Sequence, residues 1–168
     1  MLVYLVGSLF IVLTAVVQTN LLGLIEIAGA RPDLALIFTV YLANRNGPMV
    51  GQVSGFVSGL TQDMLSIAPL GFFSLTHTVI GLLSGLTRGN VELDPVVAPV
   101  VLVLAATVIK GLLYTIIAAV FGVGGPVSAV FSLQFLIEIA FNIVVTPLLF
   151  GIFGRFKALQ LDWRARTY

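Results

Sequence analysis

Three absences narrow the chemistry that this 168-residue chain can perform. It has no cysteine, which excludes thiol chemistry and disulfide bonds. It has one histidine, His77, so we expect a hydrogen-bonded core residue there and no metal ligand. It contains no G-x-S-x-G, Walker A, G-x-G-x-x-G or H-E-x-x-H motif. We therefore expect no enzyme activity, no cofactor, no metal and no nucleic-acid partner.

Charge is the next feature in short supply. Charged residues make up 9% of the chain, hydrophobic residues make up 59%, and the mean hydropathy is +1.14. In a soluble domain about a quarter of the residues are charged. The composition therefore predicts an all-α integral membrane protein in the lipid bilayer, with residues 1–168 forming a single helical bundle.

Six apolar segments are expected to cross the membrane, namely residues 2–25, 33–43, 48–60, 65–86, 96–121 and 127–153. The second segment is short. At about 1.5 Å per residue it covers little more than half of a hydrocarbon core roughly 30 Å thick. Asp33 is placed to cap this helix, and the run from Asn44 to Pro48 ends it.

The orientation follows from the basic residues, because cytoplasmic loops are enriched in Lys and Arg. With a cytoplasmic N-terminus, only Arg31 lies outside, and the residues inside are Arg45, Arg88, Arg155, Lys157, Arg164 and Arg166. In the alternative topology, segments two and three form a re-entrant hairpin and four spans remain. That would bring Arg45 near the midplane at a cost of about 2.5 to 3.5 kcal/mol, so we predict six spans with both termini cytoplasmic.

Small residues at a spacing of four mark the third segment. They form a glycine ladder at Gly47, Gly51, Gly55 and Gly59, flanked by Ser54 and Ser58. In a membrane such a stripe lets a second helix backbone approach closely. The second helix belongs either to this chain or to a partner protein. Both serines are placed to hydrogen-bond across the groove.

Lys110 and Glu138 are charged residues inside the last two spans. Each lies about eleven residues from the connecting loop, so an antiparallel hairpin brings them to the same depth, about 16 Å into the membrane. The pair serves either as a structural ion pair that sets helix register or as part of an ion or proton relay. A relay needs further ionisable groups in line, and none is expected in these spans.

A run of motifs between residues 32 and 85 resembles the family of the rod shape-determining protein MreD. The run comprises PDL at 32–34, NRNGP at 44–48, the glycine ladder, GLxxD at 59–63, SxxPLG at 66–71, and glycines at 81 and 85. Its loop and cap residues are Asp33, Asp63, Pro69 and Gly71. The expected role of Asp63 is to cap a helix that begins near Leu65.

The resemblance implies a non-enzymatic component of the cell-elongation machinery in the bacterial cytoplasmic (inner) membrane. Such a protein binds the single-pass protein MreC and is linked to the MreB filament and to the glycan polymerase and transpeptidase. It helps to control lateral peptidoglycan synthesis and cell shape. We expect the glycine ladder to form part of the docking face for MreC.

The family is also similar in fold to the S components of ECF transporters. A small-molecule-binding transporter subunit is therefore the alternative function.

Overall fold

Helices make up almost all of the structure, a computed structural model that describes residues 2–20, 26–66, 70–89, 96–122, 132–156 and 159. The helices are α1 (Leu2–Asn20), α2 (Leu34–Asn46), α3 (Pro48–Leu65), α4 (Phe72–Leu86), α5 (Val97–Phe121) and α6 (Leu133–Gly154). The described residues contain no strand beyond an isolated β-bridge between Ile27 and Ala30. The all-helical class expected from the composition is thereby confirmed.

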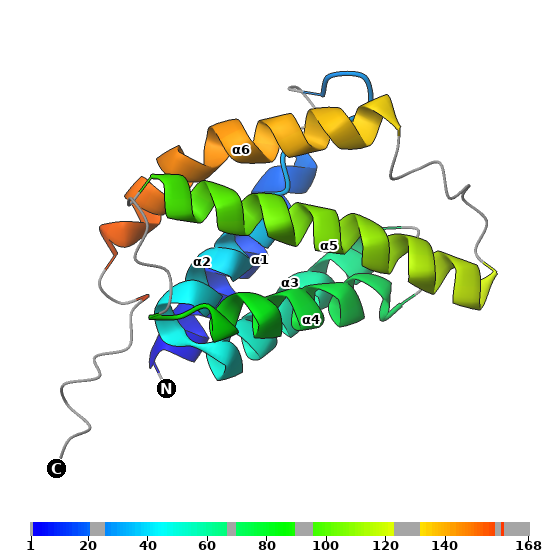
Figure 1. Ribbon diagram of the computed structural model, residues 1–168. Coiled ribbons are helices and arrows are strands. Elements are labelled where there is room, and N and C mark those ends of the chain that lie inside the picture. The colour runs from blue at the N-terminus through cyan, green and yellow to red at the C-terminus, as the bar shows by residue number, and fades with distance from the viewer. Residues whose placement is uncertain are drawn as a thin grey trace, which may run out of the picture.

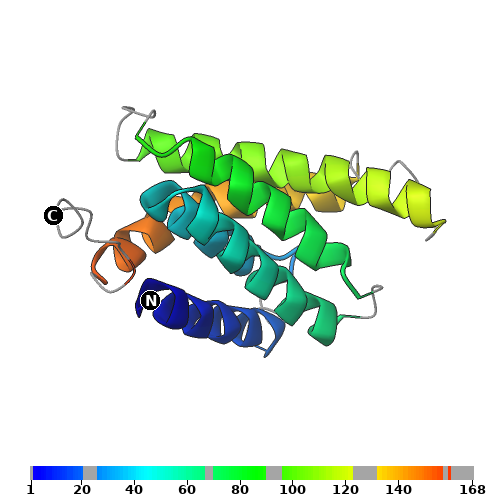
Figure 2. The same cartoon turned by 90° about the horizontal axis from the view of Figure 1, so that it is seen from below.

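Helix α2 lies at the centre of the bundle and contacts each of the other five helices (Figures 1 and 2). Every residue from Ala35 to Ala43 is buried. A helix that is apolar on all sides is stable only when it is enclosed, and this segment has the sequence ALIFTVYLA. The short second segment is therefore the core of the protein.

The chain reaches the start of α2 in an extended conformation. Arg31 is exposed, whereas Pro32 and Asp33 are already buried, so the helix begins inside the bundle. Its 13 residues span about 20 Å at 1.5 Å per residue, which is less than a full membrane crossing. This geometry explains why the apolar segment is so short.

The helix boundaries differ from the sequence-based expectation around residues 60–72. Helix α3 continues past the expected end near Leu60 to Leu65, and α4 begins at Phe72 and not near Leu65. The polar residues Thr61, Gln62 and Asp63 were expected to end α3. They remain helical because the Thr61 hydroxyl bonds to the Val57 carbonyl and Asp63 points toward α4.

Aromatic side chains fill the core beside α2. Phe38 and Tyr41 of α2 pack against Phe150 and Phe153 of α6, with ring centroids 4.6 Å apart for Phe38 and Phe153 and 5.2 Å apart for Tyr41 and Phe150. Phe10 of α1 stacks on Phe38, with ring centroids 6.0 Å apart. These edge-on and stacked contacts join α1, α2 and α6.

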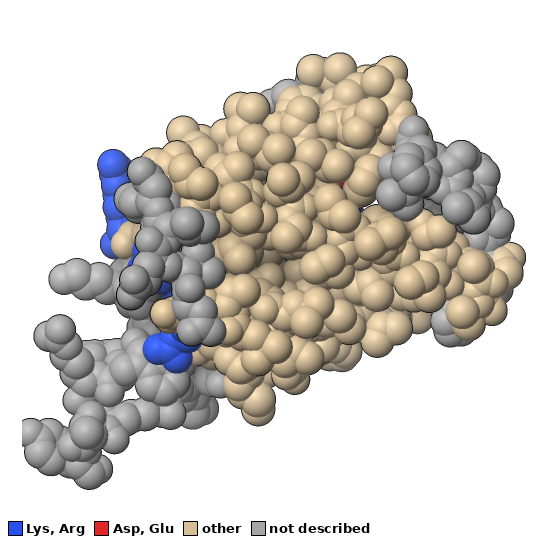
Figure 3. All heavy atoms as spheres, in the orientation of Figure 1, with Lys and Arg blue, Asp and Glu red and all other residues tan. Residues whose placement is uncertain are grey.

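The faces of α5 and α6 seen in Figure 3 are almost free of charged side chains. Their exposed side chains include Val101, Leu112, Ile116, Leu136, Val144 and Leu148. Residues Val97–Val120 and Leu133–Gly154 are each long and apolar enough to cross a membrane. Exposed apolar surface of this extent fits contact with lipid.

Candidate functional site

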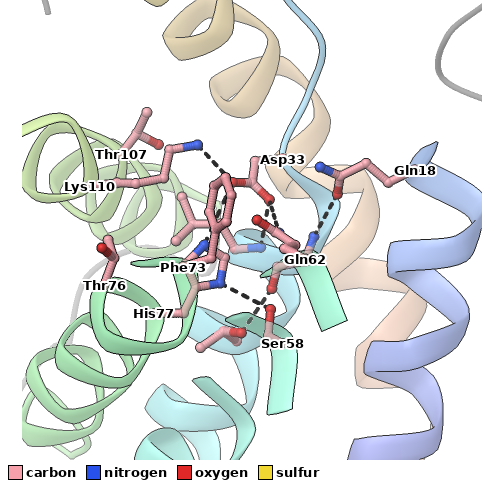
Figure 4. Close-up of polar contacts among 12 residues, drawn as sticks. Gln18, Asp33, Ser58, Gln62, Phe73, Thr76, His77, Thr107 and Lys110 are labelled. Atoms are coloured by element: carbon pink, nitrogen blue, oxygen red, sulfur yellow. Dashed lines mark hydrogen bonds and ion pairs between the residues drawn. The ribbon is translucent and has the colours of Figure 1, made fainter. Parts of the chain in front are cut away.

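Asp33 is the centre of a polar network inside the bundle (Figure 4). Its Oδ1 atom accepts hydrogen bonds from the backbone N–H of Leu36 at 3.0 Å and from Nε2 of Gln62 at 3.3 Å. Its Oδ2 atom lies 2.7 Å from Nζ of Lys110. Its own N–H donates to Oδ1 of Asn142 at 2.8 Å. One carboxylate therefore links helices α2, α3 and α5, and its backbone links them to α6.

The network exists because α2 begins away from water. The first backbone N–H groups of a helix have no partner within the helix, and leaving them unpaired in an apolar interior is costly. Besides the bonds at Asp33, the N–H of Ala35 donates to Oε1 of Gln18 on α1 at 3.2 Å. Asn142 is held in place by donating to Oγ1 of Thr107 at 3.1 Å. Side chains from α1, α3, α5 and α6 thus help to anchor the start of α2.

Lys110 binds two carboxylates. Its Nζ atom contacts Glu138 on α6 as well as Asp33. All three side chains are largely buried, with exposed fractions of 12% for Lys110, 5% for Asp33 and 20% for Glu138. No further ionisable group was expected in the last two spans, and the one that joins the pair, Asp33, comes from the start of α2. Asp33 was assigned only a capping role, yet it also joins this ion pair.

His77 extends the network to α4. Its Nδ1 atom lies 3.0 Å from Oγ of Ser58 on α3, and its Nε2 atom lies 4.0 Å from Oδ2 of Asp33. Nε2 is fully buried and has no hydrogen-bond partner among the described residues. We refer to Asp33, His77, Lys110 and Glu138 as the charged cluster.

The order Ser58, His77, Asp33 has the residue types of a hydrolase triad but not its geometry. In a serine hydrolase the histidine nitrogen nearest the serine takes its proton while the other is held by the carboxylate. Here the carboxylate is 4.0 Å away, and Ser58 is fully buried between α3 and α4. The arrangement is suited to holding the side chains of α3, α4 and the start of α2 in fixed positions.

The glycine ladder faces α4. A Cβ atom on Gly51 would overlap with the carbonyl oxygen of Gly81, and one on Gly55 would overlap with that of His77. A Cβ on Gly59 would overlap with the backbone of Phe73. The contacting positions on α4 also recur every four residues. The two backbones touch along this line, so a helix of the same chain occupies the groove.

Other residues of the groove have separate roles. Gly47 has φ +96° and lies between α2 and α3, where it caps the end of α2. Ser54 donates to the carbonyl of Gly51 in its own helix and does not bond across the groove. Ser58 does bond across the groove, to Nδ1 of His77 on α4.

Asp63 caps α4 from the last turns of α3. Its two carboxylate oxygens accept hydrogen bonds from the N–H groups of Gly71 (3.0 Å), Phe73 (2.8 Å) and Ser74 (3.1 Å) and from the Ser74 hydroxyl (2.5 Å). The capped helix starts at Phe72 and not near Leu65. Gly71, with φ +96°, supplies the left-handed turn before it. Pro69 lies outside the described residues.

Sequence reasoning missed Gln18, Gln62 and Thr107 as members of the network. Their signal was present, since each is a polar residue within or beside an apolar segment. Their partners could not be read from the sequence, because Gln18 bonds to Ala35, Gln62 to Asp33 and Thr107 to Asn142, which lie 17, 29 and 35 positions away along the chain.

Comparison with known proteins agrees with the motif run. The model of the family "rod shape-determining protein MreD" matches residues 1–156 of the 168-residue chain. No curated protein and no solved structure matches the chain. The match extends beyond the motif-bearing third to all six helices, and it confirms the resemblance. The chain belongs to the MreD family of rod shape-determining membrane proteins.

Proposed function

We propose that this protein is a non-enzymatic subunit of the cell-elongation machinery that binds MreC and helps to control lateral peptidoglycan synthesis. Membership of the MreD family carries this proposal, because it assigns the chain to rod-shape determination. The interior supports a holding role. Its buried charges and amides bind one another and fix the helices, and Ser58 is enclosed between two helices. The linked MreB filament and wall synthases are then indirect partners.

We also propose a six-span topology with both termini in the cytoplasm. Three arginines lie at helix ends: Arg45 in the last turn of α2, Arg88 just after α4, and Arg155 at the C-cap of α6. Basic side chains gather at one end of the molecule (Figure 3). The guanidinium of Arg88 reaches the carbonyl of Asn46 at 3.5 Å, next to Arg45. The N-terminus of α1 and the C-terminal end of α6 lie at this same end (Figures 1 and 2). A shared basic end favours the cytoplasmic side.

The absence of cysteine makes this topology directly testable. Single cysteines in place of Met49 and Leu70 form a matched pair, because both side chains are exposed. Met49 lies in the first turn of α3, and Leu70 lies beyond the other end of that helix. A membrane-impermeant maleimide should label Leu70→Cys in intact cells and Met49→Cys only after permeabilisation. Equal labelling of both in intact cells would contradict the proposed orientation.

We place the partner's binding surface away from the glycine ladder, because α4 packs into that groove. The exposed apolar faces are available on several helices, with Leu9 on α1, Phe56 on α3, Ile116 on α5 and Val144 on α6. We propose that the membrane helix of MreC packs against one of these faces.

Photo-crosslinking from those four positions tests the proposed function. At least one exposed position should crosslink to MreC in cells, and the protein should restore rod shape to a strain that lacks its own MreD. A crosslinker at Ser54, buried in the α3–α4 groove, is the control and should react only within the chain. Failure to crosslink or co-purify with MreC, together with failure to restore shape, would overturn the proposal.

A further inference from the structure

Asn46 brings three arginine-bearing segments of the chain together at one end of the bundle. Its side-chain Nδ2 donates to the carbonyl of Leu159 at 2.9 Å, and its own carbonyl accepts from the guanidinium of Arg88 at 3.5 Å. Asn46 is buried and directly follows Arg45, while Leu159 lies four positions after Arg155. The end of α2, the end of α4 and the segment after α6 therefore meet at Asn46. We refer to Arg45, Arg88 and Arg155 as the arginine rim.

The positive charge of the arginine rim is not balanced at this end of the bundle. Arg45 and Arg155 are exposed, and no salt bridge joins either of them to a carboxylate in the part of the chain that the structure describes. The described carboxylates lie in the interior or toward the opposite end, and they are Glu26, Asp33, Asp63 and Glu138. By sequence, the adjoining segments 90–95 and 157–168 add three basic and three acidic side chains, so an excess of three positive charges remains.

Exposed apolar side chains accompany the arginine rim. Four of them lie within four positions of one of its arginines along the chain and are at least 42% exposed, namely Met49, Leu86, Ile152 and Phe156. Cationic groups beside exposed apolar surface match an amphiphile that has an anionic head and hydrocarbon chains. A soluble anion would use the charge and leave the apolar side chains without a partner.

We propose that the arginine rim binds the headgroups of anionic phospholipids, whose acyl chains lie on the apolar side chains beside it. Guanidinium groups form charge-assisted, bidentate hydrogen bonds with phosphate oxygens. A basic side chain close to an anionic lipid surface strengthens binding about fivefold. Three arginines on segments that Asn46 holds together therefore select an anionic lipid over a zwitterionic one. This inference depends on insertion into a membrane and not on binding of MreC.

Lipid retention measured by native mass spectrometry tests the proposal. Protein released from nanodiscs of equal parts phosphatidylglycerol and phosphatidylcholine should retain phosphatidylglycerol preferentially. The double variant Arg45→Gln, Arg155→Gln should lower this preference at least about tenfold. The double variant Arg45→Lys, Arg155→Lys keeps both charges and should lower it less. Arg31→Gln is the matched control, because Arg31 is exposed before the start of α2, at the opposite end of the bundle, and should leave the preference unchanged.

Equal preference in wild type and the glutamine double variant would overturn the proposal and would leave the arginines to an acidic segment of a partner protein. Thermal unfolding in phosphatidylcholine nanodiscs checks that the double variant is folded. If it is not, the single variants Arg45→Gln and Arg155→Gln carry the test, and each should lower the preference about fivefold.

Soluble glycerol phosphate separates a lipid site from a site for free phosphate. It carries a phosphate group without acyl chains, so it should neither displace phosphatidylglycerol nor raise the Tm of the protein in detergent. Phosphatidylglycerol should raise the Tm of wild type relative to phosphatidylcholine, and it should raise that of the glutamine double variant less. A rise with glycerol phosphate as large as the rise with phosphatidylglycerol would overturn the assignment to a lipid.

Discussion

Nζ of Lys110 lies 2.7 Å from Oδ2 of Asp33, although 77 positions separate the two residues in the chain. The contact joins the middle of α5 to the buried start of α2. Lys110 also binds Glu138, so one ammonium ties together the central helix and the α5–α6 hairpin. The ammonium group of Lys110 therefore holds α5 and α6 against the buried start of α2.

Removing the charge of Lys110 alone should destabilise the protein more than removing the charges of Asp33, Lys110 and Glu138 together. Lys110→Met leaves two carboxylates without a cation and should lower the free energy of unfolding by about 3 to 5 kcal/mol. The triple variant Asp33→Asn, Lys110→Met, Glu138→Gln removes all three charges while keeping similar shapes, and it should recover part of the loss. Thermal unfolding in nanodiscs compares the two. A triple variant less stable than Lys110→Met would show that net charge is not the cause.

The close approach of α3 and α4 predicts a steric limit at Gly55. Gly55→Ala places a Cβ against the His77 carbonyl and should lower the free energy of unfolding by about 1 to 3 kcal/mol even without any partner present. Gly151→Ala is the matched control, because among the described residues no atom outside its own stretch of helix backbone lies within 4 Å of that Cβ position. The same loss in both variants would indicate a backbone effect and no contact with α4.

Asp63 should protect the first turn of α4. Asp63→Ala removes the acceptor for three backbone N–H groups and should cost about 2 kcal/mol, the upper end for a helix cap. Hydrogen exchange should accelerate at Phe73 and Ser74 more than in the rest of α4. Met64→Ala, at an exposed neighbouring side chain, serves as the control. Uniform acceleration across α4 would argue against a capping role.

Two amides on α6 should differ sharply in importance. Asn142 is fully buried and serves both Asp33 and Thr107, so Asn142→Ala should cost about 1 to 3 kcal/mol through unpaired buried groups. Gln134 is exposed and donates to the carbonyl of Gly29. Gln134→Ala should change stability by less than about 0.5 kcal/mol. Chemical denaturation of both variants checks the contrast, and equal losses would contradict it.

Some features were visible along the chain because they depend on local composition and spacing. The apolar segments predicted the helices, and the shortness of the second one marked α2 as unusual. Equal distances from a shared loop place Lys110 and Glu138 at one depth. The small residues at Gly51, Gly55 and Gly59 predicted a close helix contact. Each inference requires only periodicity and length, which a single sequence contains.

Other features depended on which helices meet. The identity of the groove's occupant could not be read from Gly55, because small-residue stripes fit any helix with a suitable face. The backbone of His77 answers that question. The sequence-based prediction also misplaced the boundary between α3 and α4. A polar residue such as Asp63 usually marks a helix end, but here its carboxylate accepts hydrogen bonds from the first turn of α4 while Asp63 itself stays in α3.

The sequence by itself determined that this protein is a helical membrane bundle, because hydropathy and residue spacing are properties of each segment alone. The tertiary structure decided that α2 is the enclosed core and that Asp33 gathers Gln62, Lys110 and Asn142 around its start. These contacts span 29, 77 and 109 positions. The physical reason is that a helix start buried away from water must find its hydrogen-bond and charge partners on other helices, and only the packing of the whole chain determines which side chains come within reach.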